Sequence, residues 1–398
     1  MAINIKNRLL NIFKGLGSAV RGNANELAAV SFAAVLVAFF ALNLFAPDKS
    51  FSEKENRMLQ EFPDVSVHDY LNGRFEKSFE DYANDQFILR DKFIRVKSSF
   101  DAAIGGIKSN GVWKGRGGYL IEDSNVPSGS FIKDNSEAIG EFIEANPGIR
   151  ARFLLAPNAV SIMKKKLPVG ANPADQNIYM DSFFEAVKKV GCEPIDVRES
   201  FEDAKKDRQL FYYTDHHWTS AGAELAYQAI KESFGLEEEY SFKQYPVKND
   251  FLGTMSSKSG FSGGRCDEIT LPVREDDGRL NSVIFYEESK KKTTEFYNLD
   301  KLEEKDAYQV FGGTNHSIYT IKTPVKGNRR LLLIKDSYAN SVLPYLMQHY
   351  TEIVVVDPRY YYDNIQDVID VEGIKDVLFL YNANTFFEDS SLKMMLEE

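Results

Sequence analysis

The chain has 398 residues, is 43% hydrophobic and carries a formal net charge of -11. This length and apolar content are sufficient for one large or two modest domains with a buried core. The acidic balance argues against a nucleic-acid partner, because phosphate binding requires a basic surface. The only two cysteines, Cys192 and Cys266, are too few for a disulfide scaffold or a four-cysteine zinc site, and their spacing does not say whether they pair.

The first distinctive element is the uncharged apolar run LAAVSFAAVLVAFFALNLFA at residues 27–46. At about 1.5 Å per residue, a helix of this length reaches roughly 30 Å, the thickness of a bilayer core. The residues before the run carry four basic side chains and one acidic side chain. The positive-inside rule therefore predicts a cytoplasmic leader at 1–26, a transmembrane anchor at 27–46 and an extracytoplasmic remainder, in a single-pass protein of the cell membrane. A cleaved signal peptide is the alternative, but the run is long for one and Ala46-Pro47 is a poor cleavage site.

Residues 47–110 form a charged, aromatic stretch with apolar side chains at helical spacing. We expect amphipathic helices here that pack on a larger body. The segment NGVWKGRGGYLIE, residues 110–122, predicts a short hairpin with glycine turns. The apolar positions of the expected helices are Phe75, Phe79 and Tyr82, then Leu89, Phe93, Val96 and Phe100.

From about residue 130 onward, short apolar runs alternate with helix-like stretches. Strands that are apolar on both faces and separated by helices predict a parallel α/β sheet with helices on both sides, in a domain over 111–398. A polar, glycine-rich region at about 238–328 interrupts this rhythm, and we interpret it as an insertion or lid on that domain. The expected strands are 152–157, 193–197, 330–337, 352–357 and 376–382, and the expected helices are 180–190, 221–234, 340–350 and 364–371.

In an open parallel sheet, ligands bind beyond the carboxyl ends of the strands. The residues that follow the apolar runs are Asn158, Lys335–Ser337, Asp357–Arg359 and Asn382. Ser337 stands at a predicted strand-to-helix turn, where its hydroxyl lies at the sheet edge and a helix N-terminus favours a developing oxyanion. An ordinary helix N-cap is the competing explanation for a serine at such a turn.

The stretch YYTDHHWTSAG, residues 212–222, places two of the five histidines between an aspartate and a tryptophan. The Asp-x-His spacing can set the carboxylate of Asp215 against one ring nitrogen of His217 and leave the other nitrogen for a serine hydroxyl. We therefore predict a catalytic relay of Ser337, His217 and Asp215. Each of the three alone is more commonly a capping, packing or turn residue, so the prediction rests on the set.

Further residues are predicted to serve the substrate or the oxyanion, with surface salt bridges, turns and ordinary packing as the competing explanations. Arg359 and Asn382 are candidates to donate to the oxyanion or to bind substrate. The expected lining of the acceptor groove comprises Trp218, Tyr338, Tyr360–Tyr362 and the insertion at 250–266, with His216 packing against or orienting the site.

Two other functions use the same residues. Asp215, His216 and His217 could bind a divalent metal ion, as in the DHH phosphoesterases, but no Asp-x-Asp set follows any predicted strand. A non-catalytic polysaccharide-binding module would use the abundant aromatic residues, most of which a hydrophobic core already explains. We expect no metal ion and no other cofactor.

The motifs resemble those of the DHHW family of SGNH-hydrolase-like proteins, which is related to the alginate O-acetylation proteins of the AlgJ and AlgX type. The resemblance runs from about residue 50 onward, and DHHW together with KDSY is its most specific part. The matching segments are SEKENRMLQEFP, DQFILRDKF, NGVWKGRGGYLIE, DHHWTSAGA, KDSYANS, DPRYY and FLYNANTF.

The resemblance implies an SGNH-hydrolase-like (flavodoxin-like) α/β fold with a circularly permuted motif order, since Asp215 and His217 precede Ser337 in the chain. It also implies O-acetylation of an extracytoplasmic polysaccharide, with acetyl groups supplied by a membrane-bound O-acyltransferase (MBOAT-type) partner. Lys-Asp-Ser stands where many SGNH enzymes have Gly-Asp-Ser, and no Gly-x-Asn-Asp block is present, so the oxyanion donors stay open. A carbohydrate acetylesterase would use the same triad.

Overall fold

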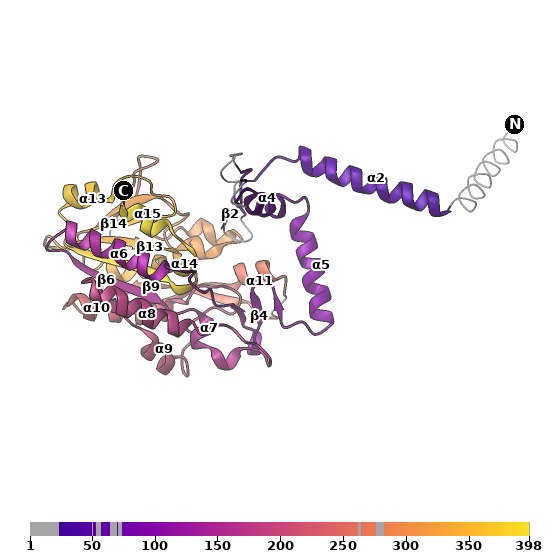
Figure 1. Cartoon of the computed structure of the whole chain (residues 1–398). Coiled ribbons are helices and arrows are strands. Elements are labelled where there is room, and N and C mark those ends of the chain that lie inside the picture. Colours follow the sequence, from indigo (N-terminus) through magenta and orange to yellow (C-terminus); the bar gives the residue numbers. More distant parts are fainter. Residues whose placement is uncertain are drawn as a thin grey trace, which may run out of the picture. The chain divides into compact units, whose positions relative to one another are not determined.

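A computed structural model describes residues 24–49, 51–52, 57–63, 70, 74–261, 264–275 and 282–397 (Figure 1). The described residues up to Phe93 form one unit, and those from Ile94 onward form a second. The boundary predicted at 110 therefore lies inside the second unit. One reason is that the strand pairing of Lys108 with Trp113 and of Ser109 with Val112 crosses the predicted boundary.

The first unit contains helices α2 (Ala24–Phe45) and α4 (Arg74–Asp85), and the short strands β1 (Phe51–Ser52) and β2 (Arg57–Met58), which pair antiparallel. Many apolar side chains of α2 are exposed, among them Phe32 and Phe40. None of the helices in the described ranges is both long and apolar enough to cross a membrane, so the anchor at 27–46 stays a prediction. The expected helices of this region are present as α4 and as α5 (Arg90–Ala103).

The centre of the second unit is an eight-stranded sheet with the order β11-β10-β12-β14-β13-β15-β6-β7. The five strands from β14 to β7 are parallel, and they coincide with the five predicted apolar runs. The bounds are β6 Arg150–Ala156, β7 Glu193–Ile195, β10 Val283–Tyr286, β11 Lys291–Thr293, β12 Ile318–Lys322, β13 Arg330–Lys335, β14 Glu352–Val356 and β15 Asp376–Asn382.

Helices cover both faces of this sheet, as the alternation of its side chains requires. In β13, Leu331 and Leu333 pack into one core cluster, and Leu332 and Ile334 pack into the other. The first cluster includes side chains of α9 (Arg198–Ala204), α10 (Ser220–Phe234) and α12 (Leu343–Leu346). The second includes side chains of α6 (Phe131–Ala145), α8 (Gln176–Lys189), α13 (Ile365–Glu372), α14 (Ala383–Glu388) and α15 (Ser391–Glu397).

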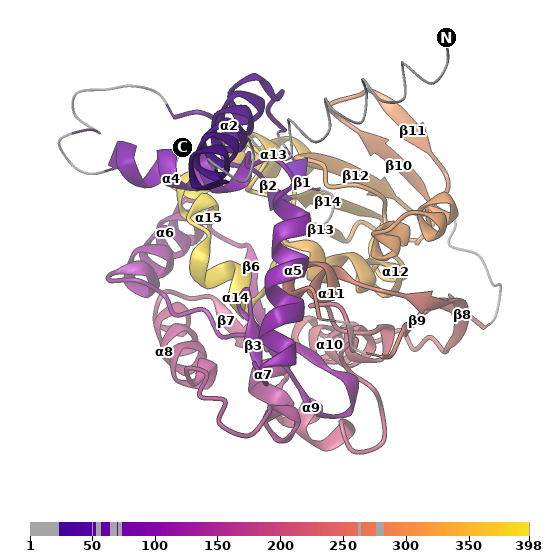
Figure 2. The same ribbon diagram turned by 90° about the vertical axis from the view of Figure 1, so that its right-hand side faces the viewer.

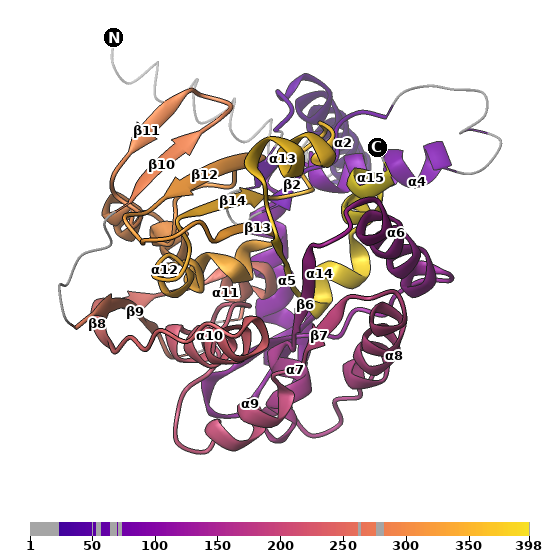
Figure 3. The same cartoon turned by 90° about the vertical axis from the view of Figure 1, so that its left-hand side faces the viewer.

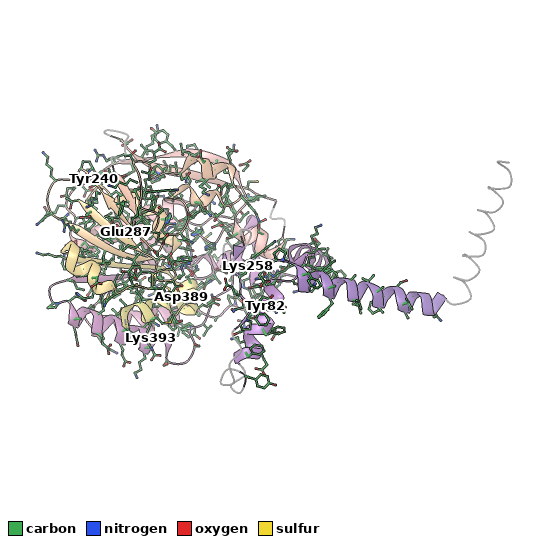
Figure 4. The ribbon with its side chains drawn as sticks, turned by 90° about the horizontal axis from the view of Figure 1, so that it is seen from above. Tyr82, Tyr240, Lys258, Glu287, Asp389 and Lys393 are labelled. Atoms are coloured by element: carbon green, nitrogen blue, oxygen red, sulfur yellow. The ribbon has the colours of Figure 1, made fainter. Side chains whose placement is uncertain are left out.

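Most of the expected helices are confirmed, with one exception. The stretch at 340–350 does not form one helix, because it is divided into the 3-10 helix η5 (Ser337–Ser341) and the four-residue α12, with Pro344 in the first turn of α12. Helix α6 was not predicted, and it packs beside α15, where Lys393 lies 3.8 Å from Asp134 (Figure 4).

The polar region at 238–328 has two parts with different structures. Its first part is a separate antiparallel pair, β8 (Phe242–Phe251) and β9 (Asp267–Arg274), with helix α11 (Thr254–Ser259) between the two strands. Its second part adds β10, β11 and β12 to the main sheet in antiparallel orientation. Figures 2 and 3 show these three strands extending the sheet on the side opposite α6 and α8.

A three-stranded antiparallel sheet precedes the main domain and confirms the predicted hairpin. Its strands are β3 (Lys108–Ser109), β4 (Val112–Lys114) and β5 (Leu120–Glu122). Both cysteines are free, with Cys192 buried and Cys266 exposed, so no disulfide joins them.

Candidate active site

Ser337 lies at the carboxyl edge of the parallel strands, directly after β13. The preceding residue, Asp336, caps the 3-10 helix η5, because its carboxylate accepts the Tyr338 N–H at 2.8 Å. The other oxygen of Asp336 accepts the backbone and side-chain N–H groups of Asn382, at the end of the neighbouring strand β15. The serine turn is thus fixed to the adjacent strand, and the Ser337 side chain is left half-buried.

The structure brings Ser337, His217 and Asp215 together as predicted. The Ser337 hydroxyl oxygen lies 2.8 Å from Nε2 of His217. Nδ1 of the same ring lies 2.6 Å from Oδ1 of Asp215, and this oxygen also accepts the His217 backbone N–H at 3.0 Å. Nucleophile, base and orienting acid are therefore in continuous hydrogen-bond contact, in the geometry that activates a serine hydroxyl.

The electrostatics keep the base of this relay neutral. Burial and the electrostatic effect of the adjacent His216 lower the pKa of His217 to about 4, although Asp215 acts in the opposite direction. Burial raises the pKa of Asp215, but its electrostatic interactions with the two histidines and the hydrogen bonds from His217 outweigh this effect and hold that pKa well below its usual range. At neutral pH the site therefore contains an ionised Asp215 and a neutral imidazole that is able to accept the serine proton.

Two residues of the insertion hold Asp215, and the sequence did not single them out for this role. Oδ2 of Asp215 accepts the backbone N–H of Thr254 at 2.8 Å and its hydroxyl at 2.9 Å. The backbone at Gly253 passes so close that an added Cβ would lie 2.3 Å from the Cβ of Asp215. Only glycine fits at this position. The Gly-Thr pair at the start of α11 therefore packs directly against Asp215 of the relay.

The turn just before Asp215 is held by hydrogen bonds to another residue that the sequence analysis did not identify. The buried carboxylate of Asp267, in β9, accepts the backbone N–H groups of Tyr213 and Thr214 and the hydroxyl of Thr214. No local pattern in the sequence marks Gly253, Thr254 or Asp267, because each acts through a contact made by the folded insertion.

Tyr308 covers the imidazole of His217. The two rings stack with centroids 3.7 Å apart and an interplanar angle of 10°. The Tyr308 hydroxyl lies 3.2 Å from the Ser337 carbonyl oxygen and 3.1 Å from the hydroxyl of Ser341. This tyrosine therefore shields the base from water and braces the serine turn from the insertion side.

Two residues predicted to line the acceptor groove lie inside the protein, and the groove prediction is wrong for both. Trp218 is fully buried, and its indole N–H donates to the Tyr338 carbonyl at 3.1 Å and to the hydroxyl of Ser341 at 2.9 Å. The Tyr338 ring is also fully buried, and its hydroxyl donates to the His216 carbonyl. Burying their large apolar rings in the core stabilises the fold more than leaving them in a solvent-exposed groove would. Their hydrogen bonds also connect the histidine loop to the serine turn.

Asn382 is not an oxyanion donor in this structure, because both hydrogens of its amide are used. Its Nδ2 donates to Asp336 at 2.6 Å and to the hydroxyl of Thr385 at 2.7 Å. Its Oδ1 accepts the Thr385 N–H and caps α14. Asn382 thus positions the serine turn through Asp336.

Arg359 lies at the carboxyl end of the neighbouring strand β14, where it pairs with Asp357 through two bonds, at 2.8 and 2.6 Å. The structure shows no hydrogen bond from Arg359 to the relay, and its side chain is 27% exposed. The Ser337 backbone N–H, in contrast, has no acceptor among the described residues, which leaves it available to an oxyanion at the serine.

A metal ion fits these residues less well than the relay does. One donor atom from each of Asp215, His216 and His217 lies within 4.8 Å of the others. However, both oxygens of Asp215 and both ring nitrogens of His217 already hydrogen-bond to the protein. Nδ1 of His216 is likewise bound to the Thr254 hydroxyl. A metal ion would have to break the relay to be coordinated by this set.

Comparison with known proteins identifies similar domains. Residues 131–250, which include Asp215 and His217 but not Ser337, match the family described as the SGNH hydrolase-like domain of acetyltransferase AlgX. The chain is 24% identical over 165 residues to the probable alginate O-acetylase AlgJ of Pseudomonas aeruginosa, covering 40% of this chain and 42% of that protein. It is 24% identical over 189 residues to AlgJ of Pseudomonas syringae, covering 42% and 46%. The chain thus spans less than half the length of these curated relatives.

Two solved structures share the fold. A DHHW family protein from Eubacterium siraeum superposes with a TM-score of 0.54 at 21% identity, over 72% of this chain and 96% of that one. Bacillus cereus PatB1 with a sulfonyl adduct superposes with a TM-score of 0.56 at 19% identity, over 69% and 97%. These matches confirm the resemblance that the motifs predicted: residues 131–250 are similar to the SGNH hydrolase-like domain of AlgX, part of the chain is similar to AlgJ, and the α/β fold is shared with the two solved structures.

Proposed function

We propose that this protein is an O-acetyltransferase that moves acetyl groups onto hydroxyls of a polysaccharide through an acyl-enzyme at Ser337. The observation that carries the proposal is the continuous Asp215–His217–Ser337 relay, with bonds of 2.6 and 2.8 Å, at the sheet edge. The similarity to proteins named alginate O-acetylase and acetyltransferase supports acetyl transfer as the reaction.

The first half of the reaction loads the serine. Neutral His217 takes the Ser337 hydroxyl proton at Nε2 while the serine oxygen attacks the carbonyl carbon of an acetyl donor. Asp215 stabilises the resulting imidazolium, and the Ser337 N–H donates to the tetrahedral oxyanion. The leaving group then departs with the proton from His217, and an acetyl ester remains on Ser337.

The second half of the reaction transfers the acetyl group from Ser337 to the acceptor. A sugar hydroxyl attacks the acetyl carbonyl and gives its proton to His217. The bond to the serine oxygen then breaks, and His217 returns the proton to that oxygen. The acetylated sugar leaves, and the relay is restored with no other reactant consumed.

An acetylesterase differs only in that water takes the place of the sugar hydroxyl. Water is present at tens of molar, but an oriented acceptor can reach an effective molarity on the order of 10⁵ M or more. The enclosure of His217 by Tyr308 supports transfer, because it limits access of water to the base.

We further propose that the catalytic domain is extracytoplasmic, that residues 27–46 anchor it in the membrane, and that an MBOAT-type membrane protein supplies the acetyl groups. The support is the uncharged apolar run, its basic leader and the exposed apolar side chains of α2. A polysaccharide is the proposed acceptor because the related AlgJ proteins are named for alginate O-acetylation.

The test follows the acetyl group. The full-length protein in detergent is incubated with p-nitrophenyl acetate and an oligosaccharide acceptor, and Ser337 is analysed by mass spectrometry. We expect an acetyl group on Ser337, acetylated sugar, and less free acetate as acceptor is added. A sulfonyl fluoride should block the reaction by modifying the same serine. Acetate release that no acceptor changes, with removal of acetyl groups from acetylated polymer, would instead identify an esterase.

A further inference from the structure

The second histidine of the motif, His216, has a fixed proton position that the relay itself imposes. The Thr254 hydroxyl lies 2.9 Å from Oδ2 of Asp215 and 2.7 Å from Nδ1 of His216. Ionised Asp215 only accepts hydrogen bonds, so the single hydroxyl proton of Thr254 points to it. The hydroxyl oxygen must then accept from His216, so Nδ1 of His216 carries a proton. In the uncharged imidazole with this proton position, the other nitrogen, Nε2, presents a lone pair.

The position of this nitrogen follows from how the two adjacent imidazoles are arranged. Their centroids lie 3.9 Å apart with an interplanar angle of 36°. Both Nδ1 edges face the same oxygen of Asp215, at 2.6 Å for His217 and 3.6 Å for His216. In two adjacent imidazoles whose Nδ1 edges face one carboxylate, both Nε2 edges lie on the side away from that carboxylate. That side is where the Ser337 hydroxyl lies, 2.8 Å from Nε2 of His217.

Nε2 of His216 has no protein partner among the described residues. The side chain is 19% exposed, against 1% for His217, and no described residue hydrogen-bonds to this nitrogen. Two carboxylates are electrostatic neighbours of His216, and both have other partners. Glu122 pairs at 2.8 Å with Lys258, which is labelled in Figure 4. Asp306 accepts the side-chain N–H of Gln309 at 3.1 Å.

We propose that His216 accepts a hydrogen bond from a second hydroxyl of the sugar, so that the acceptor of this enzyme is a vicinal diol. This inference rests on the proposed transferase function. One hydroxyl attacks the acetyl carbonyl and transfers its proton to Nε2 of His217. The neighbouring hydroxyl keeps its proton and donates it to Nε2 of His216, which orients the attack. Thr254 is the positioning residue that keeps this nitrogen an acceptor. A neutral His216 with this tautomer has no N–H on that side, so it is not an oxyanion donor there.

The experiment compares small acceptors and thus does not depend on the identity of the polymer. The full-length protein is acetylated with p-nitrophenyl acetate in the presence of propane-1,2-diol, propan-1-ol or propan-2-ol, and ester product is divided by free acetate. We expect the wild type to prefer the diol over either mono-alcohol by about 5- to 10-fold, the effect of one ordinary hydrogen bond. Because product is divided by acetate from the same acyl-enzyme, a change in acylation rate does not affect the ratio.

The decisive variant is His216→Asn. The asparagine amide lies where Nδ1 lies in histidine, so it keeps a donor to Thr254 and removes only Nε2. We expect the diol preference to fall to the statistical advantage of a second hydroxyl. His316→Asn is the matched control, since that histidine is similarly exposed (22%) and lies beside Glu288, outside the relay. It should keep the wild-type preference.

Substitutions of Thr254 test the same inference through the tautomer of His216, which a merely structural role of Thr254 would not change. Thr254→Ser keeps the hydroxyl and should keep both the diol preference and the His216 tautomer. Thr254→Val should lose both. The tautomer is read from nitrogen NMR of histidine side chains, which is practicable because the chain has only five histidines.

The outcomes separate this inference from the function on which it rests. If the wild type forms no acetyl-Ser337, the proposed function fails and this inference fails with it. If acetyl-Ser337 forms but the wild type shows no diol preference, or His216→Asn retains it, only the role of His216 is overturned. An unprotonated Nδ1 on His216 in the wild type would overturn it as well.

Discussion

The two neighbouring histidines differ because one is enclosed and the other is not. His217 lies between Asp215 and Ser337 under the ring of Tyr308, and burial contributes most to its low pKa. His216 is on the open side of the stack, with Nδ1 bound to Thr254. The same residue type is therefore the proposed base in one position and the proposed hydrogen-bond acceptor in the next.

The pKa of His217 predicts how acylation depends on pH. A general base works only when it is unprotonated, and this pKa is lowered from 6.5 to about 4. The acylation rate should therefore be constant from neutral pH down through the ordinary histidine range, and should fall only as the pH approaches about 4. The pre-steady-state burst of p-nitrophenol from the full-length protein measures this rate. A midpoint in the ordinary histidine range would show that His217 is not the buried base described here.

Substitutions in the relay should have non-additive effects. Ser337→Ala and His217→Ala should each reduce acylation by more than about 10³-fold, and the double variant should be little worse, because the residues act as a unit. Asp215→Asn should also be severe, since it removes the charge that orients the ring and stabilises the imidazolium. Ser257→Ala, at a half-exposed serine of α11, is the control and should acylate normally. Losses that simply multiply in the double variant would argue against a shared mechanism.

Among the elements, the short turn that begins α11 has the tightest fit to the site. Gly253→Ala would set a methyl group 2.3 Å from the Cβ of Asp215, so either α11 or the histidine loop must move. We expect a loss of about 1–3 kcal/mol in the free energy of unfolding, as for other overpacked sites. Acylation should fall more than this loss of stability explains, because Thr254 moves with the turn.

Urea denaturation and the acylation burst measure the two effects in the same preparation. Ser257→Ala again serves as the control, because it introduces the same residue type into α11 without a clash. Normal stability and normal acylation in Gly253→Ala would show that the turn does not press against Asp215.

The helices and strands that were predicted are those that a local pattern of apolar residues marks in the sequence. The five parallel strands are continuous apolar runs, because helices cover both faces of the sheet. Strands β10 and β11 have partly exposed faces and no such run, so they were not predicted. The helix expected at 340–350 failed for a related reason, since Pro344 and the η5 turn divide a stretch whose composition is helical.

At the scale of the whole molecule, the site joins three distant parts of the chain. Asp215 and His217 come from one loop, Ser337 from a strand end, and Gly253, Thr254 and Tyr308 from the insertion. The relay residues were predictable, because motif order and the sheet-edge rule place them together. The supporting residues were not, because only tertiary packing determines which part of an insertion reaches the relay. Trp218 and Tyr338 show the reverse error, since aromatic residues beside a motif proved to be core.

The N-terminal sequence predicts that the whole protein resides in the cell membrane. The uncharged run at 27–46, with four basic residues before it, predicts that the full chain sediments with membranes and is released by detergent but not by high salt or alkaline carbonate. Protease added to intact protoplasts should digest the domain that contains Ser337, because the positive-inside rule places it outside.

Replacing Val35 and Phe40 of α2 by lysine should release the protein into the soluble fraction, since each charge opposes insertion by about 2.5–3.5 kcal/mol at the helix centre. Lysine at Phe93 and Val96, two exposed apolar positions of α5, is the matched control and should leave the protein with the membranes. Protection of the domain in intact protoplasts would reverse the topology, and a wild-type protein in the soluble fraction would remove the anchor altogether.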